Sequence, residues 1–223
     1  MDNLIEVPTT RRYSTLGCRS KNIKAVWFVF HGYGMRSDTF IQEFDCINDE
    51  QTLVVAPEGM HRYYGKGTNG AVRANWMTSD LREYDIVNNI EFLNCVIQDL
   101  YDKGISNDVQ FGVLGFSQGA PTAFRWVSQL KVEIGCLVAW GSDIPKDVYL
   151  DNIKRLKINQ SKIKLVIGSS DEYISSEKVD DYIMEMHEQG VEFDFHTFEG
   201  GHNLHAETIR YFHARLMDDG LEY

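Results

Sequence analysis

The chain has 223 residues, of which 43% are hydrophobic and 25% are charged. This composition is typical of a folded globular protein and excludes a disordered or fibrous chain. The formal net charge of −11 argues against nucleic acids and anionic membranes as partners, because like charges repel one another at close range. The length suits one α/β domain, so residues 1–223 are expected to form a single domain.

The N-terminal segment, the absence of a long apolar stretch and the cysteines lead us to expect a cytoplasmic protein. The first ten residues, MDNLIEVPTT, have neither a basic region nor an apolar run, so we expect no signal peptide. No apolar stretch approaches the roughly 20 residues that cross a bilayer, so no stable membrane association is expected. The widely spaced cysteines form no C-x-x-C pair and are expected to be reduced: they are Cys18, Cys46, Cys95 and Cys136.

Short apolar runs alternate with longer helical patterns along the chain. The runs that predict strands are Ala25–Phe30, Thr52–Ala56, Val109–Leu114, Ile134–Trp140, Ile163–Gly168 and Val191–Thr197. The patterns that predict helices lie near Ser37–Asn48, Asp80–Asp102, Gln118–Leu130, Ser176–Gln189 and Asn203–Arg215. Continuous apolarity indicates burial on both faces, so we expect a mostly parallel sheet with helices on either side.

Two segments do not fit this alternation. Leu4–Val7 and Arg11–Leu16 are expected to add an N-terminal hairpin at one edge of the sheet. The stretch from Pro57 to Ser79 is rich in glycine and aromatic residues and is interpreted as a long irregular excursion. Such segments in compact domains are usually functional or mobile.

The motif Gly115-Phe116-Ser117-Gln118-Gly119 follows an apolar run and precedes a helical pattern. A serine with a glycine two places to either side is typical of a nucleophile elbow, where a strand turns sharply into a helix. Side chains at the glycine positions would collide with neighbouring backbone in so tight a turn. Ser117 is therefore the predicted nucleophile.

A serine nucleophile needs a base, and the base needs an orienting acid. Asp171 and His202 follow Ser117 in the order serine, acid, histidine, each in a loop after a predicted strand. Asp143 and Glu172 are alternatives for the acid. The other histidines considered are expected to be structural or on the surface: His187, His196, His205 and His213.

The oxyanion of the intermediate needs hydrogen-bond donors. One is expected to be the backbone N–H of Gln118, at the start of the helix after the nucleophile. The second is expected from the H-G-x-G loop His31–Gly34, with the N–H of Tyr33 preferred over that of Met35. His31 is expected to support this loop and not to transfer protons.

The motifs HGYG, APEG, GFSQGA, WGSDIP, GSSDEYI and GGH occur in this order along the chain. Together they resemble the phospholipase/carboxylesterase family of the α/β-hydrolase superfamily, which includes carboxylesterases and acyl-protein thioesterases. The resemblance, from about Val26 to Leu216, implies an α/β-hydrolase fold without a separate cap domain. It also implies a triad of Ser117, Asp171 and His202 and no cofactor or metal.

The predicted activity is hydrolysis of small to medium carboxylic esters through an acyl-enzyme intermediate. Between Glu58 and Asp80 there are basic and aromatic residues but no acidic ones. This segment either covers the pocket and binds an aromatic or anionic group, or packs as an ordinary solvated loop. The residues expected to bind substrate are Tyr63, Arg73, Trp76 and Met77.

Three alternatives stay open from the sequence. The same residues suit a thioesterase or a lysophospholipase acting on longer acyl chains, or acyl transfer to an acceptor other than water. A non-catalytic binding protein on a hydrolase scaffold belongs to another class, because fold does not fix function. A small-molecule ester is the expected partner, and a homodimer is left open.

Overall fold

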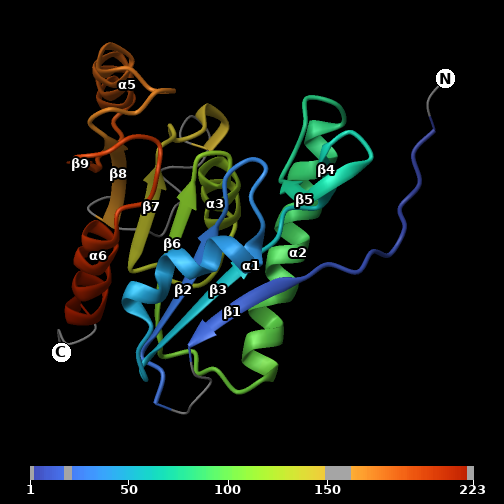
Figure 1. Cartoon of the computed structure of the whole chain (residues 1–223). Coiled ribbons are helices and arrows are strands. Elements are labelled where there is room, and N and C mark those ends of the chain that lie inside the picture. Colours follow the sequence, from blue (N-terminus) through green and yellow to red (C-terminus); the bar gives the residue numbers. More distant parts are fainter. Residues whose placement is uncertain (1–2, 18–21, 149–161, 220–223) are drawn as a thin grey trace.

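The computed structural model describes residues 3–17, 22–148 and 162–219. Within them, seven strands form one sheet in the order β1-β3-β2-β6-β7-β8-β9 (Figure 1). Their bounds are β1 Tyr13–Gly17, β2 Ala25–Phe30, β3 Thr52–Pro57, β6 Gln110–Phe116, β7 Cys136–Trp140, β8 Ile163–Gly168 and β9 Asp194–Phe198. Every pairing is parallel except that of β1 with β3. The expected mostly parallel sheet is confirmed.

The sheet is buried on both faces because its strands are apolar at consecutive positions. In β2, Val26, Phe28 and Phe30 belong to one hydrophobic cluster, while Ala25, Trp27 and Val29 belong to the other. All six residues are buried, as expected when successive side chains point to opposite faces of a covered sheet.

Helices cover both faces of this sheet (Figure 1). They are α1 Ser37–Phe40, continued by the 3₁₀-helix η1 Ile41–Ile47, then α2 Arg82–Asp102, α3 Gly119–Val127, α5 Ser176–Glu188 and α6 Ala206–Asp219. The first cluster receives side chains from α2, α3 and α5, and the second receives them from α1, η1 and α6. This arrangement is the α/β-hydrolase fold. In the described residues, no helix combines the length and apolarity that a membrane crossing requires.

The helix expected near Ser37–Asn48 is mostly a 3₁₀-helix. Ile41, Phe44 and Ile47 are buried at a spacing of three residues. A 3₁₀-helix has three residues per turn, so this spacing places the three side chains on one face. Packing of that face on the sheet therefore decides the type of helix.

The expected N-terminal hairpin is wrong. β1 pairs antiparallel with β3 over five residue pairs, from Tyr13↔Pro57 to Gly17↔Leu53. Leu4–Val7 has no regular secondary structure, and its residues are exposed. The open edge of β3 offers a full row of backbone donors and acceptors, and β1 pairs with that edge.

The interpretation of Pro57–Ser79 as irregular is also wrong. The strands β4 His61–Lys66 and β5 Asn69–Asn75 form an antiparallel hairpin beside the main sheet (Figure 1). Gly67 and Gly70 have positive φ angles of 50° and 96°, which permit the tight reversal. The aromatic and basic residues of this segment are thus held on a regular scaffold.

Candidate active site

Ser117 lies between the end of β6 and the start of α3, with a φ angle of 51°. Its backbone N–H donates to the carbonyl of Trp140 at 2.8 Å. A side chain at Gly115 would overlap the backbone of Ala120, and one at Gly119 would overlap the carbonyl of Phe30. The motif therefore adopts the strained strand-turn-helix geometry of a nucleophile elbow.

His202 and Asp171 are hydrogen bonded through Nδ1 and Oδ2 at 2.7 Å. The other carboxylate oxygen of Asp171 accepts the backbone N–H groups of Tyr173 at 2.9 Å and Ile174 at 3.1 Å. The Asp171 side chain is only 1% exposed. The carboxylate therefore holds the Nδ1–H tautomer of His202, which leaves Nε2 free to accept a proton.

The two other carboxylates that were considered have different positions. The Glu172 carboxylate accepts the backbone N–H of His202 at 3.1 Å, so it positions the histidine loop instead of the imidazole. Asp143 lies after β7 and lines a cavity. Among the described residues, neither is bonded to the ring of His202.

Aromatic packing brings the imidazole to the elbow. The ring centroid of His202 is 4.9 Å from that of Phe116, which directly precedes Ser117, and 4.8 Å from that of Tyr173. Gly141 lies against the same ring, because a Cβ there would be 2.9 Å from His202 Cε1. No hydrogen bond joins the Ser117 hydroxyl to His202 in the described part of the chain. Such bonds are often long in enzymes without substrate and shorten on binding.

Two backbone N–H groups in or next to the H-G-x-G loop are hydrogen bonded within the protein. The N–H of Gly34 donates to Ala74 at 2.8 Å, and that of Met35 donates to Gly32 at 3.2 Å. Across the described residues, the N–H groups of Tyr33 and Gln118 have no such partner. Met35 is thereby excluded as a donor, and Tyr33 and Gln118 remain the two candidates.

His31 holds the H-G-x-G loop through hydrogen bonds on both ring nitrogens. Its Nδ1 donates to the Gly32 carbonyl at 2.9 Å, and its Nε2 accepts the N–H of Gly59 at 2.9 Å. Its side chain is fully buried, and this burial lowers its pKa. A neutral imidazole with both nitrogens engaged stabilises the loop and has no free position for proton transfer.

The side chain of Gln118 joins the elbow to the base of the β4–β5 hairpin. Its Oε1 accepts the N–H of Trp76 at 3.1 Å, and its Nε2 donates to the Met77 carbonyl at 3.0 Å. The sequence interpretation assigned only the backbone of Gln118. A side-chain amide beside a nucleophile carries no local signal for a partner 41 residues away.

The residues expected to bind substrate are not equivalent. The Trp76 side chain is 0% exposed and stacks on His31, with ring centroids 4.9 Å apart. It presents no surface that a ligand could contact, so the expected direct contact is wrong in this structure. Met77 is half-buried beside the core.

Tyr63 and Arg73 are directly opposed on β4 and β5 and lie over the H-G-x-G loop. A Cβ at Gly34 would be 3.2 Å from Arg73 Nη1 and 3.4 Å from the Tyr63 hydroxyl. Burial of that hydroxyl, together with the nearby Tyr33, raises the pKa of Tyr63 to about 12. Arg73 is exposed, and no ion pair to it occurs among the described residues. Among the described residues, this cluster therefore places a cation without an ion-pair partner beside the H-G-x-G loop.

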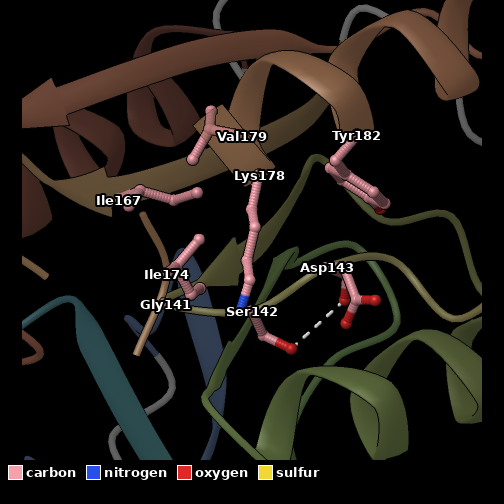
Figure 2. Close-up of a pocket in the computed structure, with 8 residues that line it drawn as sticks. All are labelled: Gly141, Ser142, Asp143, Ile167, Ile174, Lys178, Val179 and Tyr182. Atoms are coloured by element: carbon pink, nitrogen blue, oxygen red, sulfur yellow. Dashed lines mark hydrogen bonds between the residues drawn. The ribbon is translucent and has the colours of Figure 1, made fainter. Parts of the chain in front are cut away.

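A cavity of about 380 Å³ opens on the other side of the site, between the ends of β7 and β8 and helix α5 (Figure 2). Ile167, Ile174 and Val179 are its apolar residues, and Gly141 links it to His202. The sequence interpretation missed this cavity, because its walls come from three separate segments.

Glu58, in the APEG motif, is a further residue whose role was missed. It is 3% exposed and accepts two hydrogen bonds from Arg12, with Arg36 also nearby. It also accepts the hydroxyl and the backbone N–H of Ser37 at 3.3 and 3.4 Å. Burial raises the pKa of Glu58, but the hydrogen bonds and charge of Arg12 outweigh it and lower the pKa overall. Glu58 thus ties the N-terminal segment and α1 to the end of β3.

Comparisons with known proteins agree with this geometry. Residues 13–214 match the family model described as Phospholipase/Carboxylesterase. Among solved structures, esterase PE8 has a TM-score of 0.69 at 21% identity, covering 93% of this chain and 100% of that one. Acyl-protein thioesterase 2 of Zea mays has a TM-score of 0.63 at 15% identity, covering 93% and 100%. A carboxylesterase of Mesorhizobium loti has a TM-score of 0.61 at 16% identity, covering 86% and 88%.

A search of curated proteins found no match. At these identities the solved structures establish the fold alone. The family model spans most of the chain and includes the elbow, the H-G-x-G loop, Asp171 and His202. The chain belongs to the phospholipase/carboxylesterase family, whose members are serine hydrolases acting on carboxylic ester bonds.

Proposed function

We propose that this protein is a serine carboxylesterase that hydrolyses small to medium carboxylic esters through an acyl-enzyme intermediate. The observation that carries the proposal is the 2.7 Å bond between Asp171 and His202 beside a serine held at a φ angle of 51°. A buried acid, an oriented imidazole and a strained serine form the constellation that activates a hydroxyl.

Each group has a defined role in this mechanism. His202 Nε2 takes the proton of Ser117 as its oxygen attacks the ester carbonyl, and Asp171 stabilises the resulting imidazolium. The N–H groups of Tyr33 and Gln118 donate to the oxyanion. His202 then protonates the departing alcohol, and a water molecule activated by the same imidazole releases the acid.

The structure favours substrates with an anionic or polar acyl part. Arg73 is exposed beside the H-G-x-G loop, in a chain whose net charge is −11. A guanidinium without a carboxylate partner is suited to bind a substrate carboxylate in bidentate fashion. Tyr63 lies opposite this arginine on the facing strand. Met77, whose carbonyl accepts Nε2 of Gln118, is assigned as apolar surface beside the elbow.

A fluorophosphonate probe tests the mechanism directly. We expect one adduct, on Ser117, and a loss of ester turnover on the order of 10⁴–10⁶-fold in Ser117→Ala. Ser106→Ala, which changes an exposed serine, is the control and should keep full labelling and turnover. An adduct on another residue, or turnover that survives Ser117→Ala, would overturn the proposal.

The thioesterase or lysophospholipase alternative is separated by substrate length. Short-chain esters should be hydrolysed with a higher kcat/KM than long-chain acyl thioesters or lysophospholipids. The opposite order would favour the alternative. If activated esters give neither a burst nor steady-state release, a binding protein would be favoured instead.

A further inference from the structure

The cavity between β7, β8 and α5 lies beside the predicted base of the reaction. Gly141 both lines the cavity and touches the imidazole, since a Cβ there would be 2.9 Å from Cε1 and 3.1 Å from Nδ1 of His202. Ile174 also lines it, and its N–H holds the carboxylate of Asp171. The cavity therefore borders the Asp171–His202 pair, whereas Tyr33 and Arg73 lie at the H-G-x-G loop.

The chemistry of ester cleavage assigns the two sides different parts of the substrate. The oxygen that leaves must lie within hydrogen-bond reach of His202 Nε2, because that atom protonates it. The group bonded to that oxygen therefore extends along the imidazole side of Ser117. Resting on the proposed function, we propose that this cavity binds the alcohol part of the ester, with Val179, Ile174 and Ile167 as its apolar contact surface.

The lining indicates which alcohols fit. The apolar residues Ile167 and Val179 are 5% and 6% exposed and face the cavity (Figure 2). At the rim, Lys178 extends from α5 toward Gly141 and Ser142, and Asp143 lies nearby (Figure 2). Among the described residues, neither charged group has an ion-pair partner, and their opposite signs favour a neutral alcohol. A volume of about 380 Å³ is near the lower end of ligand sites, so an aliphatic or aryl alcohol of moderate size is expected.

An alcohol bound in the same cavity can also accept the acyl group from the acyl-enzyme in place of water. A bound alcohol gives its proton to His202 while its oxygen bonds to the acyl carbon. The bond from that carbon to Ser117 Oγ then breaks, and His202 returns the proton to Ser117. The products are a new ester and the free enzyme, which is the reverse of the acylation step with a different alcohol.

The test compares hexyl acetate with ethyl acetate, which differ only in the alcohol part. Val179→Phe places a ring in the cavity and should lower the ratio of their kcat/KM values about tenfold, equivalent to the burial of about two methylene groups. Met184→Phe is the matched control, because it makes a similar change on α5 at a residue that is 63% exposed. In Met184→Phe, the ratio of kcat/KM for hexyl acetate to that for ethyl acetate should equal the wild-type ratio.

Two further measurements keep the test decisive. Lys178→Trp narrows the cavity from an exposed position and should lower the same ratio if Val179→Phe does not fold. With 1-hexanol added during turnover of ethyl acetate, hexyl acetate should form in the wild type and fall about tenfold in either cavity variant.

The outcomes separate the inference from the proposed function. Normal fluorophosphonate labelling of Ser117 with unchanged ratios in both cavity variants would overturn the alcohol pocket alone. A loss of preference that follows acyl length, measured with ethyl acetate and ethyl hexanoate, would assign the cavity to the acyl part and also overturn it. Absence of labelling at Ser117 would instead contradict the proposed function.

Discussion

The elbow around Ser117 and the turn of the β4–β5 hairpin are both built on glycine, but their surroundings differ. At the elbow, side chains at Gly115 and Gly119 would overlap the backbone of Ala120 and Phe30. In the hairpin turn, a Cβ at Gly67 would meet nothing within 4 Å. Gly67 and Ser117 have nearly the same φ angle, 50° and 51°. The φ angles are alike, and the two turns differ in how closely other backbone surrounds them.

This difference divides the site into a constrained part and an adaptable part. The elbow is surrounded by buried strands, so a change there displaces the central sheet. The hairpin stands beside the sheet with most of its side chains exposed. Under the proposed function, we expect substitutions on the hairpin to alter substrate preference without displacing Ser117. The following experiments test this division, from the largest expected effect to the smallest.

Gly119→Ala and Gly67→Ala form the most direct test. The first should destabilise the fold by more than about 4 kcal/mol, because the new Cβ overlaps the backbone of β2. The second should cost only about 1–2 kcal/mol, the strain of a left-handed residue. Urea unfolding and soluble yield measure both. Comparable stability of the two variants would contradict the division.

Gln118→Ala should disconnect the two parts. Its loss leaves the N–H of Trp76 and the carbonyl of Met77 without their partners, which should cost about 2 kcal/mol in the free energy of unfolding. Because the backbone N–H of Gln118 is retained, fluorophosphonate labelling of Ser117 should persist. Gln98→Ala removes an exposed glutamine on α2 as the control and should change stability by less than about 0.5 kcal/mol. An equal effect of the two variants would show that the link is unimportant.

Arg73→Ala should alter selectivity and leave the reaction in place. The ratio of kcat/KM for monoethyl adipate to that for ethyl hexanoate should fall about tenfold, because one charged contact is lost. Arg62→Ala serves as the control, since Arg62 is exposed on the same hairpin and points to the face opposite Tyr63. If this kcat/KM ratio is unchanged in Arg73→Ala, or falls equally in both variants, Arg73 does not bind the substrate carboxylate.

Glu58 should give the smallest effect, visible in the pH dependence of stability. Its pKa is lowered in the folded state, so its contribution is present above the unfolded pKa of about 4.3 and is lost as pH falls through the folded pKa. Glu58→Gln should therefore be less stable than the wild type at pH 7, with the difference shrinking below about pH 4. Urea midpoints from neutral to acidic pH measure this, with the exposed Glu91→Gln as the control. A difference that grows on acidification would contradict the assignment.

The sequence by itself determined the main strands and the order of the candidate site residues. Burial on both faces makes a strand continuously apolar, as in Ala25–Phe30, and this signal is local. The glycines around Ser117 are also a signal that can be recognised within five residues, although the backbone that requires Gly119 belongs to Phe30 on β2. Asp171 and His202 were predicted by their positions after strands, which is where a parallel sheet presents its loops.

Only the tertiary structure decided between residues whose local sequences look alike. Asp171 and Asp143 both follow strands, yet only Asp171 is bonded to His202. From the sequence, Trp76 was predicted to bind substrate, but its ring stacks on His31 in the core. Likewise, Pro57–Ser79 was interpreted as an irregular segment, but it contains the paired strands β4 and β5. Burial and strand pairing depend on contacts between segments far apart in the chain. The hydrophobic pattern of one segment therefore does not indicate which other segment will pack against it.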